Sequence, residues 1–435
     1  MSANFSKRTV KADIAVIGAG LAGLCAALSA ARNGYKVALV TDRSVLGGNA
    51  SSEIRVNPRG ADYAPWNRYA RETGIMEEIF NHILARAQRA GQWSWQDFDA
   101  VYFDLVFSEK NIALELNTYI HKAEKKGAAI VAVEGNQSRS ETLLRIEADS
   151  FIDASGDGTV GRLAGCETRA GTESRHEFGE YYGPEQPEPG TMGTTLLFTG
   201  KNVGHKTEFK TPDWAVPFGQ TDAAYRIAHS IFPTADGNYG GFWWLECGGD
   251  ADPIRDDNAL SLHLRKAVYG LWGFIKNSGL YPDSECHELD WIGYLGGKRE
   301  SRRLMGEHIV NSVEIMNQVD YPDNIGYTGW PIDVHPKEGY KSTTCGCTHY
   351  WLPGPANMPA RMLISKDVPN LLFAGRCVSA TREALGTLRL ICTTAVMGQA
   401  AGTIAALSLE NGKTPGGLVR QNYDVIERRL LKDDQ

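Results

Sequence analysis

The chain has 435 residues, enough for one to three domains with a sizeable core. Hydrophobic residues make up 42% and charged residues 22%, as in an ordinary soluble globular protein. The formal net charge of -7 argues against non-specific binding to nucleic acid or to an anionic membrane, because both need a basic surface.

The N-terminal residues lack the long apolar run of a signal peptide, and no stretch of about 18 apolar residues follows. We therefore expect a cytoplasmic protein without a membrane span. The cysteines are scattered, and only Cys345 and Cys347 form a close pair. One C-x-C pair, without a second pair or suitably spaced histidines, is weak evidence for a metal, so we predict no metal site.

The first predicted elements form a βαβ unit. The run ADIAVIGAG at 12–20 is typical of a buried parallel strand that ends in glycine. Residues 21–35 are alanine-rich with helical spacing, and KVALVTD at 36–42 predicts a second strand.

A G-x-G-x-x-G motif, Gly18, Gly20 and Gly23, stands between this first strand and its helix. Gly18 makes the tight turn, Gly20 lets a pyrophosphate approach the backbone, and Gly23 lets the helix pack closely on the strand. The phosphates would lie at the helix N-terminus, where free N–H groups and the helix dipole favour anions. The motif therefore predicts a dinucleotide site.

The acidic residue that binds ribose hydroxyls should lie roughly 20 residues past these glycines, where the chain has Thr41. Asp42 comes next and would point the other way along a regular strand. Either Thr41 binds the ribose, or the strand has ended and Asp42 turns in. The sequence leaves both possibilities open.

The rest of the chain predicts one nucleotide-binding domain interrupted by an insertion. A helical stretch is predicted at about 63–98, and strands are predicted within 113–135 and 143–158. Aromatics, prolines and irregular loops then dominate, apart from a helix within 258–279, until a strand at 370–376 and a long helix at 387–412. We predict a nucleotide-binding domain of residues 1–170 and 347–435, and an inserted α+β substrate domain of residues 171–346.

Three features favour FAD over a nicotinamide cofactor. The loop after the second strand carries small residues that can line a pyrophosphate and a ribityl chain: Gly47, Gly48, Asn49, Ser51 and Ser52. The strand that ends in FIDASGDG at 151–158 returns the chain to the dinucleotide. A second strand–turn–helix at 370–390 has a helix N-terminus near Gly386, which could stabilise negative charge on a reduced flavin.

Together these blocks resemble the FAD-dependent oxidoreductase family of the glutathione-reductase-like flavoprotein superfamily. The resemblance is to the branch with L-G-G-N-x-S-S-E after the second strand, an I-D-A-[ST]-G-D-G turn and a C-terminal A-G-R-x-[VI]-S. It implies an α/β fold, with a Rossmann-like FAD-binding domain whose parallel sheet carries helices on both faces and a small antiparallel sheet. It also implies FAD contacts from Gly18, Gly20, Gly23, Asp42 or Thr41, Arg43, Gly47, Gly48, Asn49, Ser51, Ser52, Gly156, Asp157, Gly375, Arg376 and Gly386. The chain departs from the wider superfamily at Thr41 and at Arg376, where an A-G-D motif would place an aspartate on the ribityl chain.

The candidate catalytic residues lie in three segments. A flavin carries the redox chemistry, while the protein positions the substrate and supplies acid–base groups. GWPIDVHP at 329–336 places Asp333 and His335 on one side of an extended segment, so the carboxylate could orient the ring. His349 precedes the C-terminal strand and is a second candidate base, and Arg302 in GKRESRR is a candidate for binding an acidic substrate. The structural alternatives are a loop bonded to local backbone, a packed aromatic loop and a solvated helix start.

These features predict an FAD-dependent dehydrogenase or oxidase of a small polar alcohol. A sugar or sugar derivative is the leading substrate, with a histidine as general base and aromatic side chains to stack on the ring. One alternative is a fumarate-reductase-like enzyme that acts on a C–C bond of a carboxylic acid. Another is a flavoprotein that is not catalytic or that modifies RNA. The sequence shows no second G-x-G-x-x-G unit for a nicotinamide, so we expect oxygen, a quinone or a partner protein as electron acceptor.

Overall fold

The computed structural model describes residues 5–90, 94–220, 237–343 and 346–435. Its centre is a five-stranded sheet in the order β20-β8-β2-β3-β4, with every neighbouring pair parallel. The strands are β2 (Ile14–Ile17), β3 (Val37–Val40), β4 (Ile112–Glu115), β8 (Ser150–Asp153) and β20 (Leu371–Phe373). All but β4 are buried along their whole length, which explains why they appear in the sequence as continuous apolar runs.

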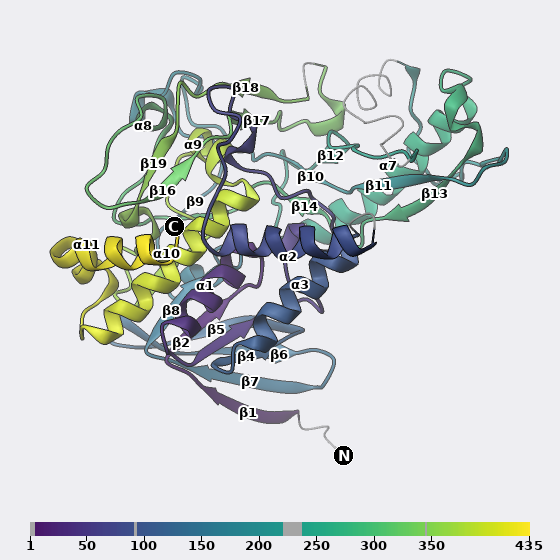
Figure 1. Ribbon diagram of the computed structural model, residues 1–435. Helices are drawn as coiled ribbons and strands as arrows, with labels where there is room; N and C mark the ends of the chain where they lie inside the picture. Colours follow the sequence, from purple (N-terminus) through teal and green to yellow (C-terminus); the bar gives the residue numbers. More distant parts are fainter. Residues whose placement is uncertain (1–4, 91–93, 221–236, 344–345) are drawn as a thin grey trace.

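Helices cover one face of this sheet. The helix α1 (Leu21–Arg32) contacts four of the five strands and packs against α10 (Ile391–Glu410) and α3 (Trp95–Ser108). Glycines allow the close approach of α10, because a Cβ added at Gly398 would lie 2.0 Å from the carbonyl oxygen of Ala22. Figure 1 shows these helices together above the strands.

A second sheet, in the order β1-β7-β6-β5, contributes to the same core. It contains β1 (Ser6–Lys11), β5 (Thr118–Lys126), β6 (Ala129–Gln137) and β7 (Thr142–Glu147). The sequence predicts a small antiparallel sheet, and β5, β6 and β7 are antiparallel. The edge strand β1, however, pairs with β7 in parallel, so the sheet is mixed.

Two predicted helices differ from those in the structure. The helical stretch expected at 63–98 is instead α2 (Ile75–Ala90) and α3, which begin later. Pro65 has no backbone N–H and Gly74 adopts a φ of 67°, so a helix starts only after them. The long C-terminal helix is split into α9 (Arg382–Leu388) and α10, with the extended residue Leu390 between them.

Among the described residues, α10 alone has the length and apolar composition of a membrane-spanning helix. That stretch is 94% buried inside the protein. It lies between α1 and the C-terminal helix α11 (Pro415–Lys432), so it acts as a core helix.

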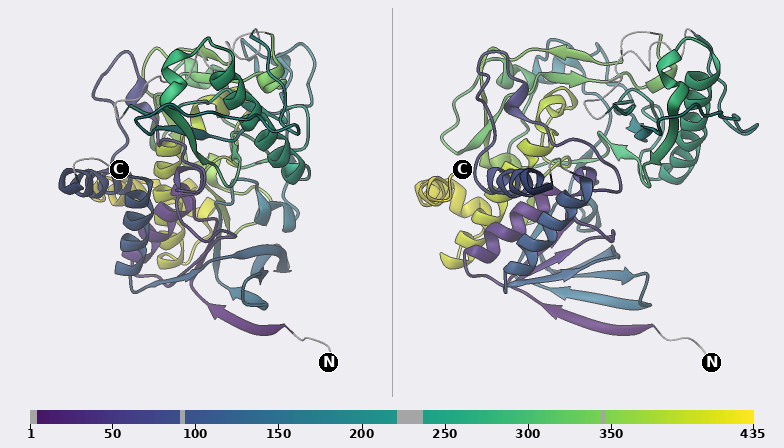
Figure 2. Two further views of the ribbon diagram at one scale, coloured as in Figure 1. Left: turned by 90° about the vertical axis from the view of Figure 1, so that its right-hand side faces the viewer. Right: turned by 45° about the vertical axis from the view of Figure 1, so that its right-hand side comes forward.

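The middle of the chain builds a second hydrophobic core around α7 (Asp257–Asn277), β11 (Phe198–Asn202) and β13 (His287–Ile292). The side chain of Trp272 is fully buried there, and a Cβ at Gly200 would lie 2.3 Å from its ring. Figure 2 shows this part projecting away from the central sheet. The division at residues 170 and 346 and a separate inserted domain remain predictions.

Short elements connect these parts. The hairpin of β17 (Ile332–Val334) and β18 (Thr348–Tyr350) is antiparallel. The others are α4 (Thr159–Leu163), α5 (Arg175–Phe178), α8 (Ser312–Met316), β9 (Thr168–Arg169), β10 (Thr194–Thr195), β12 (Glu246–Cys247), β14 (Gly297–Lys298), β15 (Arg303–Leu304), β16 (Asn324–Thr328), β19 (Ala356–Pro359) and the 3-10 turns Gly48–Ala50, Ala61–Tyr63, Pro282–Cys286, Gly339–Lys341 and Ala360–Leu363.

Candidate functional site

The glycine turns predicted to bind a dinucleotide lie together at the carboxyl edge of the parallel sheet. A Cβ at Gly18, after β2, would lie 2.2 Å from the carbonyl oxygen of Ala154, which follows β8. A Cβ at Gly48, in the loop after β3, would lie 2.8 Å from Gly20 Cα. Open α/β sheets bind ligands at this edge, so the structure brings the predicted turns to the expected place.

The start of α1 forms a cradle that fits a pyrophosphate. Gly18 has a φ of 103°, and a Cβ at Gly23 would lie 1.8 Å from Gly18 O, so both positions require glycine. At Gly20, by contrast, the nearest atom to an added Cβ is 3.9 Å away, which leaves space for a ligand. No side chain caps α1, so its first N–H groups can face a phosphate.

Both Thr41 and Asp42 remain candidates for binding the ribose hydroxyls. Thr41 is buried, its N–H donates to Glu115 O, and its carbonyl accepts from Thr118 N, so strand pairing continues through it. Asp42 is exposed.

The loop after β3 carries several predicted FAD contacts, some of which already have protein partners. The Ser52 hydroxyl and N–H both donate to Asp99 of α3, and Asn49 Nδ2 donates to Lys298 O at 3.1 Å. Ser51 is fully buried. Gly47 has a φ of 94°, and a Cβ there would lie 2.3 Å from the ring of Tyr102. These contacts fix the shape of the loop, and direct FAD contacts from its side chains remain predictions.

Unsatisfied buried groups in this region also fit a ligand. Arg43 Nη1 and Glu53 Oε2 are buried 3.9 Å apart, and neither makes a hydrogen bond with the described residues. Arg376 Nη1, just after β20, is also buried and makes no hydrogen bond with the described residues. Buried polar atoms are rarely left without partners, so these positions suit the polar atoms of a cofactor.

Asp157 links the turn after β8 to the turn after β20. Its carboxylate lies 3.1 Å from Lys298 Nζ and 3.5 Å from Arg376 Nη2. Burial alone would raise the pKa of Asp157, but Arg376 and Lys298 hold that pKa below its usual value. Gly375, between β20 and Arg376, has a φ of 89°, and Gly156 has a φ of 77°.

Arg302 also belongs to this turn. Its Nη1 donates to Asp157 O at 3.0 Å, and burial followed by the charge of Arg162 lowers its pKa. The sequence predicts Arg302 as a substrate-binding arginine. The structure positions it by the Asp157 turn, whereas Arg299 of the same segment pairs with Glu246, the carboxylate that contacts His335.

The predicted residues Asp333, His335 and His349 do come together, on the β17–β18 hairpin. Asp333 and His349 are direct partners across the two strands. Asp333 Oδ2 lies 3.2 Å from His335 Nε2, and Asp333 Oδ1 lies 3.3 Å from His349 Nε2. Cys347 joins them, with Sγ 3.4 Å from His349 Nε2. Its sequence neighbour Cys345 lies outside the described residues.

Three residues that the sequence analysis did not place here complete this cluster. His335 Nδ1 lies 3.0 Å from Glu246 Oε1, and Glu246 Oε2 lies 2.7 Å from Arg299 Nη1. Arg389 Nη2 donates to Asp333 Oδ2 and to Asp333 O, both at 3.1 Å. Of Cys347 and these three added residues, only Cys347 has a sequence spacing that links it to a predicted histidine, because it stands two residues before His349 in an extended segment.

The charges keep Asp333 ionised. Burial would raise its pKa, but His335, His349 and Arg389 hold that pKa well below the usual value of an aspartate. The pKa of Cys347 rises to about 12 through burial and the charge of Asp333, so its thiol is protonated unless a cation joins it. The cluster therefore holds an ionised Asp333 beside a thiol and two imidazole rings.

The cluster adjoins the helices predicted to approach the flavin. A Cβ at Gly386 of α9 would lie 2.9 Å from Asp333 N, so α9 packs directly on β17. Arg389 follows α9 and immediately precedes Leu390, the N-cap of α10. Gly386 therefore has a packing role, and its contact with FAD remains a prediction.

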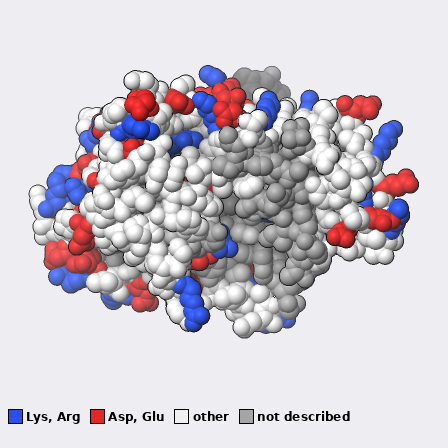
Figure 3. All heavy atoms as spheres, turned by 90° about the horizontal axis from the view of Figure 1, so that it is seen from above, with Lys and Arg blue, Asp and Glu red and all other residues white. Residues whose placement is uncertain are grey.

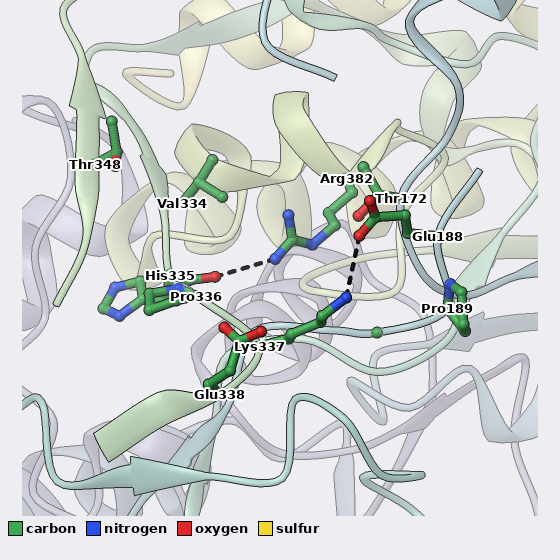
Figure 4. Close-up of a pocket in the computed structure, with 11 residues that line it drawn as sticks. Thr172, Glu188, Pro189, Val334, His335, Pro336, Lys337, Glu338, Thr348 and Arg382 are labelled. Carbon is green, nitrogen blue, oxygen red and sulfur yellow. Dashed lines mark hydrogen bonds and ion pairs between the residues drawn. The ribbon is translucent and has the colours of Figure 1, made fainter. Parts of the chain in front are cut away.

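A cavity of about 360 Å³ adjoins the hairpin, and His335 is among the residues that line it. Val334 and Thr348 line it, and these residues alternate with Asp333 and His349 along their strands. Figure 4 shows Lys337 paired with Glu188 across this cavity, and Arg382 bonded to the backbone of His335. Seen from above the view of Figure 1, the described part of the surface is mainly uncharged, with most charged side chains toward its margins (Figure 3).

Comparisons with known proteins agree with the predicted cofactor. A family model described as FAD dependent oxidoreductase matches residues 13–430. No curated protein matches the chain.

Among solved structures, the chain is similar to a geranylgeranyl bacteriochlorophyll reductase-like protein from Thermoplasma acidophilum, at 15% identity and a TM-score of 0.45, covering 98% of this chain and 86% of that one. It is also similar to L-proline dehydrogenase from P. horikoshii, at 11% identity and a TM-score of 0.42, covering 94% and 95%. A flavoprotein/dehydrogenase from Cytophaga hutchinsonii matches at 14% identity and a TM-score of 0.40, covering 93% and 80%. Similarity at this level says nothing about the substrate.

Proposed function

Because the chain belongs to the FAD-dependent oxidoreductase family, we propose that it oxidises a small polar alcohol, with a sugar or sugar derivative as the leading substrate class. FAD is the cofactor, and when bound it supplies the hydride acceptor. The glycine cradle at Gly18, Gly20 and Gly23 and the turns at Asp157 and Arg376 would hold it. The protein itself must bind the alcohol and accept its hydroxyl proton. The observation that carries the proposal is the pair of Asp333 and His349 beside the junction of α9 and α10.

His349 is the better placed of the two histidines to act as the base. His335 is only 5% exposed, and its two ring nitrogens face two carboxylates, Glu246 and Asp333. The His349 side chain is 27% exposed, and its Nε2 faces Asp333 Oδ1. An ionised Asp333 stabilises the imidazolium that forms when the other ring nitrogen of His349 takes a proton.

Exposed aromatic rings beside His349 support a sugar-like substrate. The Trp351 ring centroid lies 6.0 Å from that of His349, and Trp351 is 43% exposed. Tyr182 stacks on Tyr350 of the same strand, with ring centroids 3.4 Å apart, and is 39% exposed. Such rings can cover the apolar face of a sugar while polar groups bind its hydroxyls.

The carboxylic acid alternative has less support, because its arginines already have partners. Arg361 pairs with Asp323 at 3.0 Å, Arg299 pairs with Glu246, and Arg302 binds the Asp157 carbonyl. Family membership makes the protein an oxidoreductase, which disfavours a purely structural role for the flavin.

Anaerobic bleaching of the bound flavin tests the proposal. A panel of sugars and sugar alcohols should bleach the holoprotein, and a panel of dicarboxylates should not. The variant His349→Gln should reduce the rate of bleaching by about 10²- to 10⁴-fold, since it removes a general base. His308→Gln is the matched control, because His308 is also partly buried and pairs with a carboxylate, Glu314.

Bleaching by dicarboxylates alone would contradict the proposal. So would a His349→Gln bleaching rate within about threefold of wild type, because loss of a general base should slow the rate at least about a hundredfold. Admitting oxygen, a quinone or a candidate protein to the bleached enzyme then identifies the electron acceptor.

A further inference from the structure

Three different metal-binding side chains meet in the cluster on the β17–β18 hairpin. An aspartate oxygen of Asp333, a ring nitrogen of His335 and the sulfur of Cys347 all lie within 4.8 Å of one another. We propose that these three residues bind one Zn²⁺ ion. The sequence alone predicts no metal, because Cys347 reaches the other two only when β18 folds back on β17.

The spacing of the nitrogen and oxygen donors matches a tetrahedral ion. Zinc binds nitrogen and oxygen at about 2.0–2.1 Å and sulfur at about 2.3 Å, so tetrahedral angles place neighbouring N and O ligands about 3.3 Å apart. His335 Nε2 and Asp333 Oδ2 are 3.2 Å apart. A mixed set of one sulfur, one nitrogen and one oxygen is also a set that zinc accepts.

The surroundings of His335 orient it as a ligand. Its Nδ1 lies 3.0 Å from Glu246 Oε1, and Arg299 holds the other oxygen of Glu246 at 2.7 Å. When Nδ1 donates its proton to Glu246, the lone pair of Nε2 points toward Asp333. Ligating histidines in metal sites typically have a carboxylate on the second ring nitrogen in this way.

A bound cation would also satisfy a buried oxygen that lacks a hydrogen bond within the described part of the chain. Asp333 Oδ1 is buried and accepts no well-aligned hydrogen bond from the described residues, although His349 Nε2 lies 3.3 Å away. Both ring nitrogens of His335 otherwise face buried carboxylate oxygens, Glu246 Oε1 and Asp333 Oδ2. A bound metal and a cluster held by hydrogen bonds and ion pairs alone are therefore the two alternatives to separate.

Three protein ligands leave a fourth position open, as in zinc sites that bind water or a substrate oxygen. His349 is next to this site, with Nε2 3.4 Å from Cys347 Sγ. An ion here would favour loss of the hydroxyl proton from a bound alcohol. That role rests on the proposed function, whereas the presence of the ion does not.

Metal content of the FAD-loaded protein tests the inference. The protein is incubated with Zn²⁺, freed of loosely bound metal and analysed by mass spectrometry and by zinc X-ray absorption. We expect one zinc per chain, with one sulfur at about 2.3 Å and the remaining ligands at about 2.0–2.1 Å. Cys347→Ser and Asp333→Asn should lose at least tenfold in affinity, and Glu246→Gln should lose about 10- to 100-fold.

Cys286→Ser is the matched control, because Cys286 is also a half-buried free cysteine but lies outside the cluster. It should retain full zinc content. Bound flavin and thermal unfolding report whether each variant is folded. Any of three results would overturn the inference. Wild-type protein could retain no stoichiometric zinc, the X-ray absorption spectrum could show no sulfur ligand, or a folded Cys347→Ser could bind zinc as tightly as wild type. None of these measurements needs a substrate, so zinc binding without bleaching by alcohols would contradict only the proposed function.

Discussion

Glu383, the second residue of α9, should make the protein less stable as the pH rises toward neutrality. Its side chain is 3% exposed and accepts a hydrogen bond from the Ser312 hydroxyl at 2.7 Å. Burial, followed by the nearby charge of Glu180, raises the pKa of Glu383 from 4.5 to about 7. The folded protein therefore holds a proton between pH 4.5 and 7 that the unfolded chain has already released.

The sign and size of the effect follow from this difference. Where the folded state binds more protons than the unfolded state, the free energy of unfolding falls as the pH rises. Each unit of pKa shift corresponds to 1.36 kcal/mol, so the loss between pH 4.5 and 7 is about 3 kcal/mol and levels off above pH 7.

The variant Glu383→Gln removes this loss, because glutamine resembles the protonated acid and cannot ionise. Relative to wild type, it should show little difference near pH 5 and should be more stable by up to about 3 kcal/mol at pH 8. Urea unfolding of the holoprotein at several pH values measures the difference. Glu288→Gln is the control, because Glu288 is exposed and loses little solvation on folding. A stability difference for Glu383→Gln that stays constant from pH 5 to pH 8, or that shrinks with rising pH, would refute the reasoning.

Three further variants test the cofactor cradle, the core and the cluster. Gly20→Val should leave the fold intact but reduce flavin retention at least tenfold, measured by absorbance after gel filtration, because its side chain fills the open space over the start of α1. Gly398→Ala should destabilise the protein by about 1–3 kcal/mol in urea unfolding, since its Cβ would lie 2.0 Å from Ala22 O. In metal-free protein at pH 7, Asp333→Asn should cost about 3–5 kcal/mol, because it leaves Arg389 buried without its counter-ion. That difference should shrink below the usual pKa of an aspartate, as the depressed pKa of Asp333 requires.

The dinucleotide-binding half of the molecule could be predicted because its signals are local. Gly18 and Gly23 are fixed by contacts within one βαβ unit, which places the turn and the helix at known spacings. The apolar strands at Ile14 and Val37 are buried on both faces, so they appear as continuous hydrophobic runs. Family membership confirms the FAD-dependent oxidoreductase prediction, but the finer superfamily branch remains a prediction.

The partners in the histidine cluster could not be predicted because they depend on tertiary structure. Asp333 lies in β17 and His335 follows that strand directly, so their proximity follows from the alternation of side chains along an extended segment. The contact of Asp333 with His349 depends on the register of a hairpin whose two strands are separated by 13 residues, at 335–347. Glu246 and Arg389 come from segments far away in the sequence, and no local pattern connects a glutamate in β12 or an arginine after α9 with a histidine after β17.

The junction of α9 and α10 combines a local sequence signal with contacts that depend on tertiary structure. The sequence predicts a helix N-terminus near Gly386 that could stabilise negative charge on a reduced flavin, but Gly386 lies inside α9, and no helix begins there. In the structure, its missing side chain lets α9 press on the backbone of Asp333, while Arg389 binds the carboxylate of the same residue. Asp333 is thus held from both sides by the helix pair that leads into the core helix α10. We therefore expect a change at Gly386 or at Arg389 to reach the candidate base through Asp333, because buried and closely packed groups cannot shift independently.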